Sequence, residues 1–238
     1  MITTSRVQPR EPLLVYIEAN PLMYWMLPTS HDPNLQSQQS RLRLVQEAKD
    51  LFAVFNRHQG ATDPIWVITS QWALTESHSI LYQDALWARG INYGRSSGSN
   101  DPRRLFPPDK VCLQNASQTL DSQVRRVLDK HVTLVIDAPD QRIWPIALRL
   151  AEECGIYAPD CLHLATALYA GCNLFVTQDI GFIKAIHYHR TNVIENILTD
   201  LFVPIAPPTF EACPLVSNRR LQQGTPTARE YLDSIDYT

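Results

Sequence analysis

Short apolar segments alternate along this chain with longer segments in which apolar residues recur every three or four positions. The short segments predict β-strands buried on both faces of a sheet, and the periodic segments predict amphipathic helices that cover it. Because strands alternating with helices are joined by βαβ crossovers, the pattern predicts an α/β fold with a mainly parallel central sheet. The predicted strands are residues 12–17, 65–69, 132–136 and 173–177, and the clearest predicted helices are residues 40–57, 70–83, 140–154 and 159–170.

Two segments show neither the short apolar runs of strands nor the periodic apolar positions of helices. Residues 84–115 contain scattered glycines, paired serines and several prolines, which predicts an insertion or a long loop. Residues 204–226 are rich in proline and polar residues and predict a wrapping tail, followed by a short amphipathic helix near the C-terminus. We therefore predict a domain over residues 1–203, with an insertion at 84–115, and a C-terminal extension over residues 204–238.

Composition narrows the classes of protein. A length of 238 residues is consistent with one large domain, and a formal net charge of −3 disfavours binding to nucleic acid through bulk positive charge. The five cysteines are scattered, with no C-x-x-C pair and no signal-peptide pattern at the start, which favours a cytoplasmic location and buried thiols. No apolar run approaches the roughly 20 residues that span a bilayer, so no contact with a membrane is expected.

Acidic residues stand near the ends of the predicted strands. Glu18 directly follows the first strand, Asp179 follows the last one, Asp160 opens the helix before that strand, and Glu76 lies on the helix after the second. The carboxyl ends of parallel strands share one edge of a sheet, where ligands bind. Four carboxylates gathered there repel one another unless a divalent cation neutralises them, and oxygen ligands of this kind suit Mg²⁺ or Mn²⁺. Such a centre can activate water to hydrolyse a phosphodiester.

Several motifs together resemble a PIN domain, the ribonuclease fold of the VapC-type toxins. They are Val15-Tyr-Ile-Glu-Ala-Asn20, Thr69-Ser70 with Leu74-Thr-Glu76, Pro159-Asp-Cys-Leu-His-Leu-Ala-Thr-Ala167, and Phe175-Val-Thr-Gln-Asp179 with Phe182-Ile-Lys184. The resemblance covers residues 12–189, apart from the 84–115 segment. Its second half is the more specific, because the D-x-x-H-x-A-T-A helix is followed by T-x-D at the family's spacing.

The resemblance implies a three-layer α/β/α fold and a PIN-type endoribonuclease that binds Mg²⁺ or Mn²⁺. It also implies an RNA substrate, and it raises the possibility of a toxin with an antitoxin partner and of a homodimer. By this resemblance, Glu18 stands where the family usually has Asp, and its extra methylene shifts the metal by about a side-chain bond. The implied site consists of the metal ligands Glu18, Glu76, Asp160 and Asp179, with Asn20 and Thr177 assisting.

Each of these residues also has a structural interpretation. Asp160 can be a helix N-cap, Glu76 a solvated helix residue, and Asn20 and Thr177 turn or cap residues. His163 lies among apolar residues, which favours a hydrogen-bonded core or interface histidine over a ligand. Zinc at His187-x-His189 is disfavoured, because no Cys or third His lies at a recognised interval.

Paired arginines are candidates for contacts with the RNA backbone. Arg103 and Arg104 are the best of them because they lie in the predicted long loop, and Arg125-Arg126 and Arg219-Arg220 are the others. Solvated surface is the usual alternative for such pairs. For the whole chain, the main alternative is a non-catalytic PIN-like module that binds RNA or a protein partner. A phosphatase or response-regulator receiver is disfavoured, because no D-x-D follows the first strand.

Overall fold

The centre of the protein is a sheet of parallel strands. The computed structural model describes residues 12–26, 36–58, 64–92, 109–131, 134–137, 140–203, 210–221 and 224–235. In these residues the sheet has 5 strands in the order β3-β2-β1-β4-β5, and every neighbouring pair is parallel. The strands are β1 (Leu13–Ile17), β2 (Ile65–Ser70), β3 (Leu134–Ile136), β4 (Leu174–Thr177) and β5 (Glu211–Pro214). The predicted parallel α/β sheet is confirmed.

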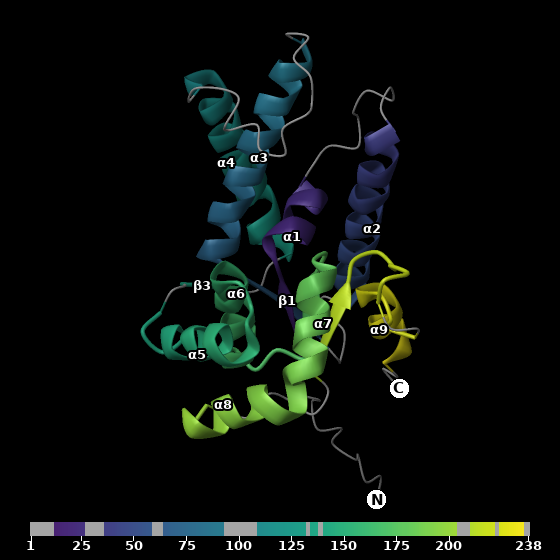
Figure 1. Cartoon of the computed structure of the whole chain (residues 1–238). Helices are drawn as coiled ribbons and strands as arrows, with labels where there is room; N and C mark the ends of the chain where they lie inside the picture. Colours follow the sequence, from purple (N-terminus) through teal and green to yellow (C-terminus); the bar gives the residue numbers. More distant parts are fainter. Residues whose placement is uncertain are drawn as a thin grey trace, which may run out of the picture.

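Helices cover both faces of the sheet (Figure 1). One face packs against α5, α6, α7 and α8, and the other against α1, α2 and α9. The fold is therefore the expected three-layer α/β/α arrangement. The helices are α1 (Ala19–Met26), α2 (Gln36–His58), α3 (Gln71–Asn92), α4 (Lys110–His131), α5 (Trp144–Cys154), α6 (Ala158–Tyr169), α7 (Ile180–His189), α8 (Glu195–Asp200) and α9 (Ala228–Ser234), with a π-helical turn, Arg190–Ile194, between α7 and α8.

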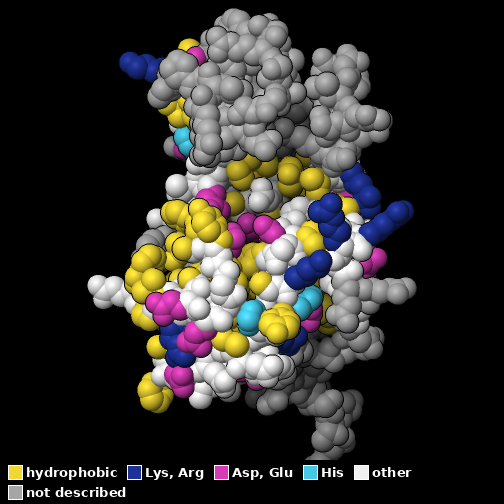
Figure 2. Space-filling view, in the orientation of Figure 1, with side chains coloured by type: hydrophobic (Ala, Val, Ile, Leu, Met, Phe, Trp, Pro, Cys, Tyr) yellow, Lys and Arg dark blue, Asp and Glu magenta, His cyan; other side chains and the backbone are white. Residues whose placement is uncertain are grey.

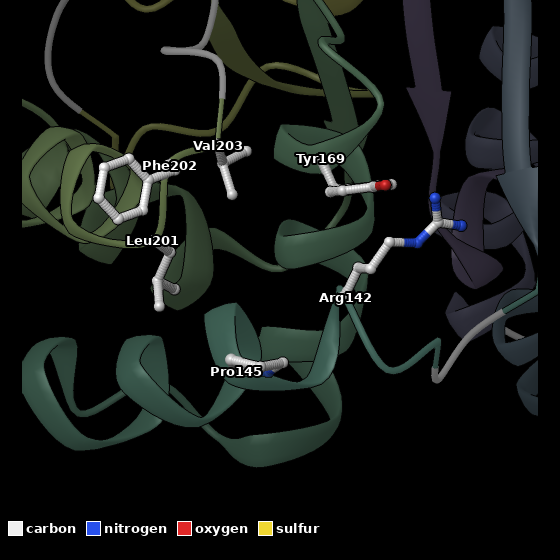
Figure 3. A pocket seen from close by; sticks show the side chains of 6 residues that line it. All are labelled: Arg142, Pro145, Tyr169, Leu201, Phe202 and Val203. Atoms are coloured by element: carbon white, nitrogen blue, oxygen red, sulfur yellow. The ribbon is translucent and has the colours of Figure 1, made fainter.

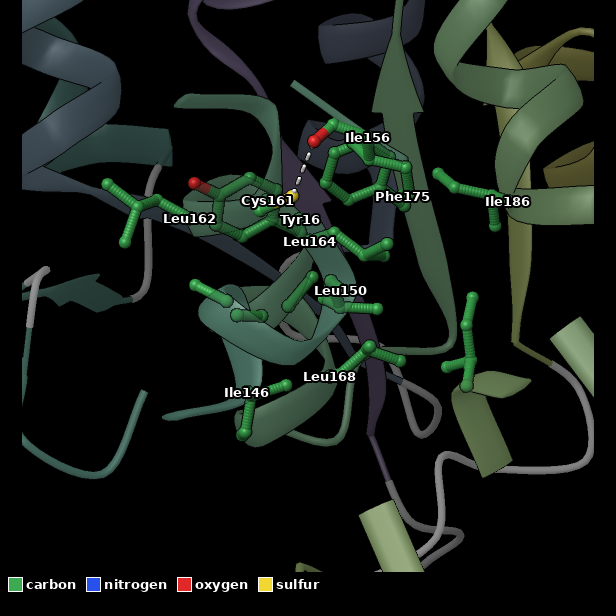
Figure 4. Packing of buried hydrophobic residues seen from close by; sticks show 14 of the residues in the cluster. Tyr16, Ile146, Leu150, Ile156, Cys161, Leu162, Leu164, Leu168, Phe175 and Ile186 are labelled. Carbon is green, nitrogen blue, oxygen red and sulfur yellow. Dashed lines mark hydrogen bonds between the residues drawn. The ribbon is translucent and has the colours of Figure 1, made fainter. Parts of the chain in front are cut away.

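The core on the α6 side is built around Tyr16 of β1. Its ring stacks on Phe175 of the neighbouring strand, with 5.4 Å between the ring centroids and 2° between the planes. Leu150 of α5 and Leu164 of α6 belong to the same cluster and are fully buried, and Figure 4 shows how these side chains converge beneath the strands. Strands with both faces packed in this way read as continuous apolar runs, which is why their positions could be predicted.

The predicted loop at residues 84–115 is wrong at both of its ends. Helix α3 continues to Asn92 and α4 begins at Lys110, so residues 84–92 and 110–115 are helical. Packing explains the difference, because Leu86, Cys112 and Ala116 are buried and tertiary contacts outweigh the weak helix propensity of the glycine in α3. The two helices lie side by side and extend beyond the carboxyl edge of the sheet (Figure 1). Residues 93–108 lie outside the described residues.

The predicted C-terminal tail contains a fifth strand that sequence analysis missed. Strand β5 pairs with β4 from Leu174↔Glu211 to Thr177↔Pro214. Helix α9 begins at a capping box formed by Thr227 and Glu230 and buries Leu232 in the core on the α2 side. The sheet therefore continues beyond residue 203, while the predicted short C-terminal helix is confirmed.

Two expectations from composition can be compared with the structure. All five cysteines are buried free thiols, in agreement with the prediction. Among the described helices, none is both long enough and apolar enough to cross a bilayer.

Candidate metal centre

Glu18 joins the central strand to a helix. Its backbone N–H donates to the carbonyl of Val176 on β4 at 3.1 Å, and its own carbonyl accepts the first hydrogen bond of α1, from Leu22 at 3.1 Å. The side chain is only 4% exposed. A buried carboxylate is costly unless it is paired, hydrogen-bonded or bound to a cation, so this position needs partners.

The hydroxyl of Thr177, at the end of β4, is one of those partners. Thr177 Oγ1 donates a short hydrogen bond to Glu18 Oε2 and accepts one from the backbone N–H of Asp179 at 3.0 Å. Asp179 is the N-cap of α7, and its Oδ1 accepts from the backbone N–H of Phe182 at 2.9 Å. Thr177 therefore fixes the first carboxylate and the loop that carries the last one.

Glu76 lies on α3 and is held by His163. Its Oε2 lies 2.7 Å from His163 Nε2, and His163 Nδ1 lies 2.9 Å from the hydroxyl of Tyr16. That hydroxyl also lies 2.9 Å from Ser70 Oγ, which accepts from the backbone N–H of Ala73 at 3.1 Å.

The donors and acceptors in this series of hydrogen bonds, from Glu76 through His163 to Tyr16, follow from the chemistry of its members. A neutral imidazole that donates from Nε2 to the Glu76 carboxylate accepts at Nδ1 from the Tyr16 hydroxyl, and this tautomer satisfies both hydrogen bonds. The preferred interpretation of His163 as a hydrogen-bonded core residue is confirmed: its side chain is buried. It nonetheless touches the candidate site directly through Glu76. Burial also raises the pKa of the Tyr16 hydroxyl, which therefore stays protonated as a donor.

Asp160 lies in the first turn of α6 and is partly buried. The N-cap position is occupied by Tyr157, which makes no side-chain capping bond, so Asp160 is not the cap. Burial raises the pKa of Asp160 to about 6, and repulsion from Asp179 and Glu76 adds to the rise. The carboxylate is thus free of a capping role and sits in the field of two other acids.

The pKa of the Glu18 carboxyl group is raised for the same reasons as that of Asp160. Burial raises its pKa to about 7 and repulsion from Asp160 and Glu76 adds to the rise, while the hydrogen bond from Thr177 lowers it. Negative charge is therefore concentrated at this edge of the sheet. Figure 2 shows acidic side chains gathered at the centre of this face.

The donor set fits a small divalent cation. One ligand atom from each of Glu18, Glu76 and His163 lies within 4.8 Å of the others, although both ring nitrogens of His163 already have hydrogen-bond partners. Asp160 and Asp179 are not part of this group: the charge of Asp160 acts on Glu18, and the charge of Asp179 acts on Asp160. Opposite ligands of Mg²⁺ at about 2.1 Å are about 4 Å apart, so modest side-chain movement suffices to bind one. Carboxylate oxygens dominate the cluster, which favours Mg²⁺ or Mn²⁺ over zinc. No other cluster of potential metal ligands occurs within the described parts of the chain.

Other candidate residues lie elsewhere. Asn20 is in the first turn of α1, two residues from Glu18, and is partly buried. His187 Nε2 contacts Glu211 at 2.8 Å and the carbonyl oxygen of Ala212 at 3.1 Å, so it has structural partners. Arg103 and Arg104 lie outside the described residues.

A pocket of about 390 Å³ lies apart from these acids. Figure 3 shows it beyond the C-terminal end of α6, which carries Asp160 at its opposite end. Its lining contains no acidic side chain: Arg142, Pro145, Tyr169, Leu201, Phe202 and Val203. This pocket therefore lacks the chemistry of a cation site, and the carboxylates mark the candidate centre.

Comparison with known families agrees with the geometry. The family model of the PIN domain matches residues 110–187, about a third of the chain, from the start of α4 into α7. The match includes Asp160, Thr177 and Asp179, whereas Glu18 and Glu76 lie outside it and are joined to the others by the fold. No curated protein matches the chain.

Proposed function

We propose that this chain, which contains a PIN domain, is a metal-dependent ribonuclease that hydrolyses RNA phosphodiester bonds. The observation that supports the proposal is the cluster of Glu18, Glu76 and His163 at the carboxyl edge of the sheet, with Asp160 and Asp179 near enough for their charges to raise neighbouring pKa values. Two of them, Glu18 and Asp160, have pKa values raised to about 7 and about 6 by burial and mutual repulsion. Keeping these carboxylates ionised and close together is unfavourable, and no Lys or Arg among the described residues pairs with them. Such a group is typical of a site that binds cations.

Glu18, Glu76, Asp160 and Asp179 would hold the metal, as Mg²⁺ or Mn²⁺. When bound, such an ion lowers the pKa of a coordinated water and offsets the charge of the phosphate. Residues of the protein itself orient these ligands. Thr177 orients Glu18 through its hydrogen bond, His163 orients Glu76, and the cap at the start of α7 fixes the backbone of Asp179. For Asn20 we propose a role in setting the Glu18 carboxylate from the first turn of α1.

Cleavage of a labelled mixed RNA pool tests the proposal. Purified protein is incubated with Mn²⁺, Mg²⁺ or a chelator, beside Asp160→Asn, Asp179→Asn and the control Asp200→Asn, whose exposed side chain lies on α8. We expect metal-dependent cutting that is lost in the first two variants and kept in the third. Full activity of both site variants would overturn the proposal. No cutting by the wild type, despite metal binding, would favour the alternative of a binding module.

The finer expectations stay predictions with tests of their own. A toxin with an antitoxin partner predicts that the chain arrests growth on expression and that a co-expressed neighbour relieves the arrest. A homodimer predicts twice the chain mass in light scattering. The cytoplasmic location can be checked by cell fractionation.

A further inference from the structure

The segment that follows β5 is attached to the loop of the metal centre. Because β5 runs parallel to β4, with Thr177 opposite Pro214, the residues after Pro214 emerge at the same edge of the sheet as the acids. The backbone N–H of Val216 donates to Oε1 of Gln178 at 3.3 Å, and Gln178 lies between Thr177 and Asp179. The C-terminal segment is therefore anchored beside the site.

Two arginines follow this anchor and point to solvent. Arg219 and Arg220 are exposed and lie in a turn closed by Asn218, whose Oδ1 accepts from the N–H of Arg220 at 2.9 Å. Three residues of extended chain span at most about 11 Å, so the Cα of Arg219 lies within about that distance of Val216. Neither guanidinium forms an ion pair with any residue the structure describes.

Helix α7 starts next to Asp179 and presents further exposed residues as it runs away from it. Gly181, Lys184 and Tyr188 are exposed and fall on one helical face, three and four positions apart. Lys184 lies about 7.5 Å along the helix axis from Asp179 at 1.5 Å per residue. The side chain of Tyr188 is 79% exposed, so its ring is available to a partner. Figure 2 shows basic side chains beside the acidic group, over α7 and the C-terminal segment.

We propose that Lys184, Arg219, Arg220 and Tyr188, here named the basic strip, bind the RNA strand that flanks the cleaved bond. This inference rests on the proposed ribonuclease function. The arginine forks suit phosphate oxygens, and an exposed aromatic ring suits the stacking of an unpaired base. Single-stranded RNA is favoured over an acidic peptide because the peptide has no bases to stack on Tyr188. A strand on the strip also leads directly to the carboxylates. The strip thus supplies local positive charge to a chain whose net charge is −3.

Fluorescence anisotropy with a labelled 12-nucleotide single-stranded RNA, in chelator so that nothing is cut, tests the strip. Affinity is measured between 50 and 200 mM salt for wild type and for Arg219→Gln/Arg220→Gln. Each phosphate contact contributes about 0.7 to the slope of log affinity against log salt, so we expect the slope to fall by about 1.4. Tyr188→Ala should weaken binding about tenfold with little change in slope.

The matched control is Arg142→Gln/Arg149→Gln, which removes the same charge from exposed or partly buried positions next to and on α5. Equal weakening by the two double variants would mean that only net charge matters and would overturn the strip. So would unchanged binding by the strip variants, or equally tight binding of a poly-glutamate peptide. Wild-type protein that binds no RNA at 50 mM salt would count against both proposals. A strip variant that binds RNA like the wild type, in a protein that cuts RNA with Mn²⁺, would overturn the strip alone, which separates the two failures. Circular dichroism confirms folding, and Lys184→Gln serves as a second strip variant.

Discussion

Tyr16 links the central strand to the histidine that holds Glu76. Its hydroxyl lies 2.9 Å from both Ser70 Oγ and His163 Nδ1, and all three residues are buried. Tyr16→Phe removes this hydroxyl and keeps the ring, which stacks on Phe175. The substitution therefore removes the hydrogen bonds and leaves the hydrophobic packing in place.

The expected cost follows from the groups left behind. Nδ1 of His163 loses its donor in a buried place, and an unsatisfied buried polar group costs about 1–3 kcal/mol. We expect the free energy of unfolding to fall by that amount. Substituting a residue that hydrogen-bonds to a metal ligand typically lowers metal affinity about 10–100-fold. Tyr16 does not contact Glu76 itself and acts on it through His163. We therefore expect Mn²⁺ affinity to fall about tenfold.

Urea unfolding followed by circular dichroism measures the first quantity, and calorimetric titration with Mn²⁺ measures the second. Tyr157→Phe is the matched control, because it removes the same hydroxyl from a side chain that is 72% exposed. A surface change of this kind should shift stability by less than about 0.5 kcal/mol. If Tyr16→Phe behaved like this control in both assays, the chain from Tyr16 through His163 would not orient Glu76.

Three further predictions concern the acids and the residues that hold them. Thr177→Val should lower the free energy of unfolding by about 1–3 kcal/mol and weaken Mn²⁺ binding. The control, Thr166→Val, loses only a hydrogen bond to a helical carbonyl oxygen and should leave metal binding intact. Equal Mn²⁺ affinity of the two variants would contradict this prediction. Glu18 has a folded pKa of about 7 against an ordinary 4.5, so its ionisation opposes folding. In chelator, urea unfolding should show stability falling as the pH rises from 4.5 to about 7, by up to about 3 kcal/mol from this group. Mn²⁺ should reverse this loss, and a wild-type profile identical to that of Glu18→Gln would refute it. At Gly181, an added Cβ would lie 3.2 Å from Asp179 Oδ1, the oxygen that caps α7. Gly181→Ala should therefore displace this carboxylate and slow the cutting of RNA, and unchanged rates would show that Asp179 tolerates the crowding.

Local patterns were enough to place the acids. Glu18 and Asp179 stand immediately beyond buried apolar runs, and parallel strands bring their carboxyl ends to one edge whatever the loops do. Asp160 could be placed in the same way, because it begins the helix that precedes the last predicted strand. Their positions relative to the strands could therefore be predicted without any long-range contact, whereas their roles as metal ligands stay predictions.

Features that depend on tertiary contacts were missed. Strand β5 contains Pro214 and is short, and proline in an apolar run argues against a strand except at a sheet edge, which is where β5 lies. The partners of His163 could not be predicted, because Tyr16 and Glu76 are remote from it in sequence and only the fold brings them together. The helical ends of the 84–115 segment owe their structure to packing between α3 and α4.

The central claim is that the carboxylates form one divalent-metal centre. Calorimetric titration of Mn²⁺ into the full chain tests it most directly, with Asp160→Asn as the site variant and Asp200→Asn as the control for loss of one negative charge. We predict saturable binding to the wild type and the control, weakened at least tenfold in Asp160→Asn. No binding to the wild type, or equal affinity in all three proteins, would contradict the account.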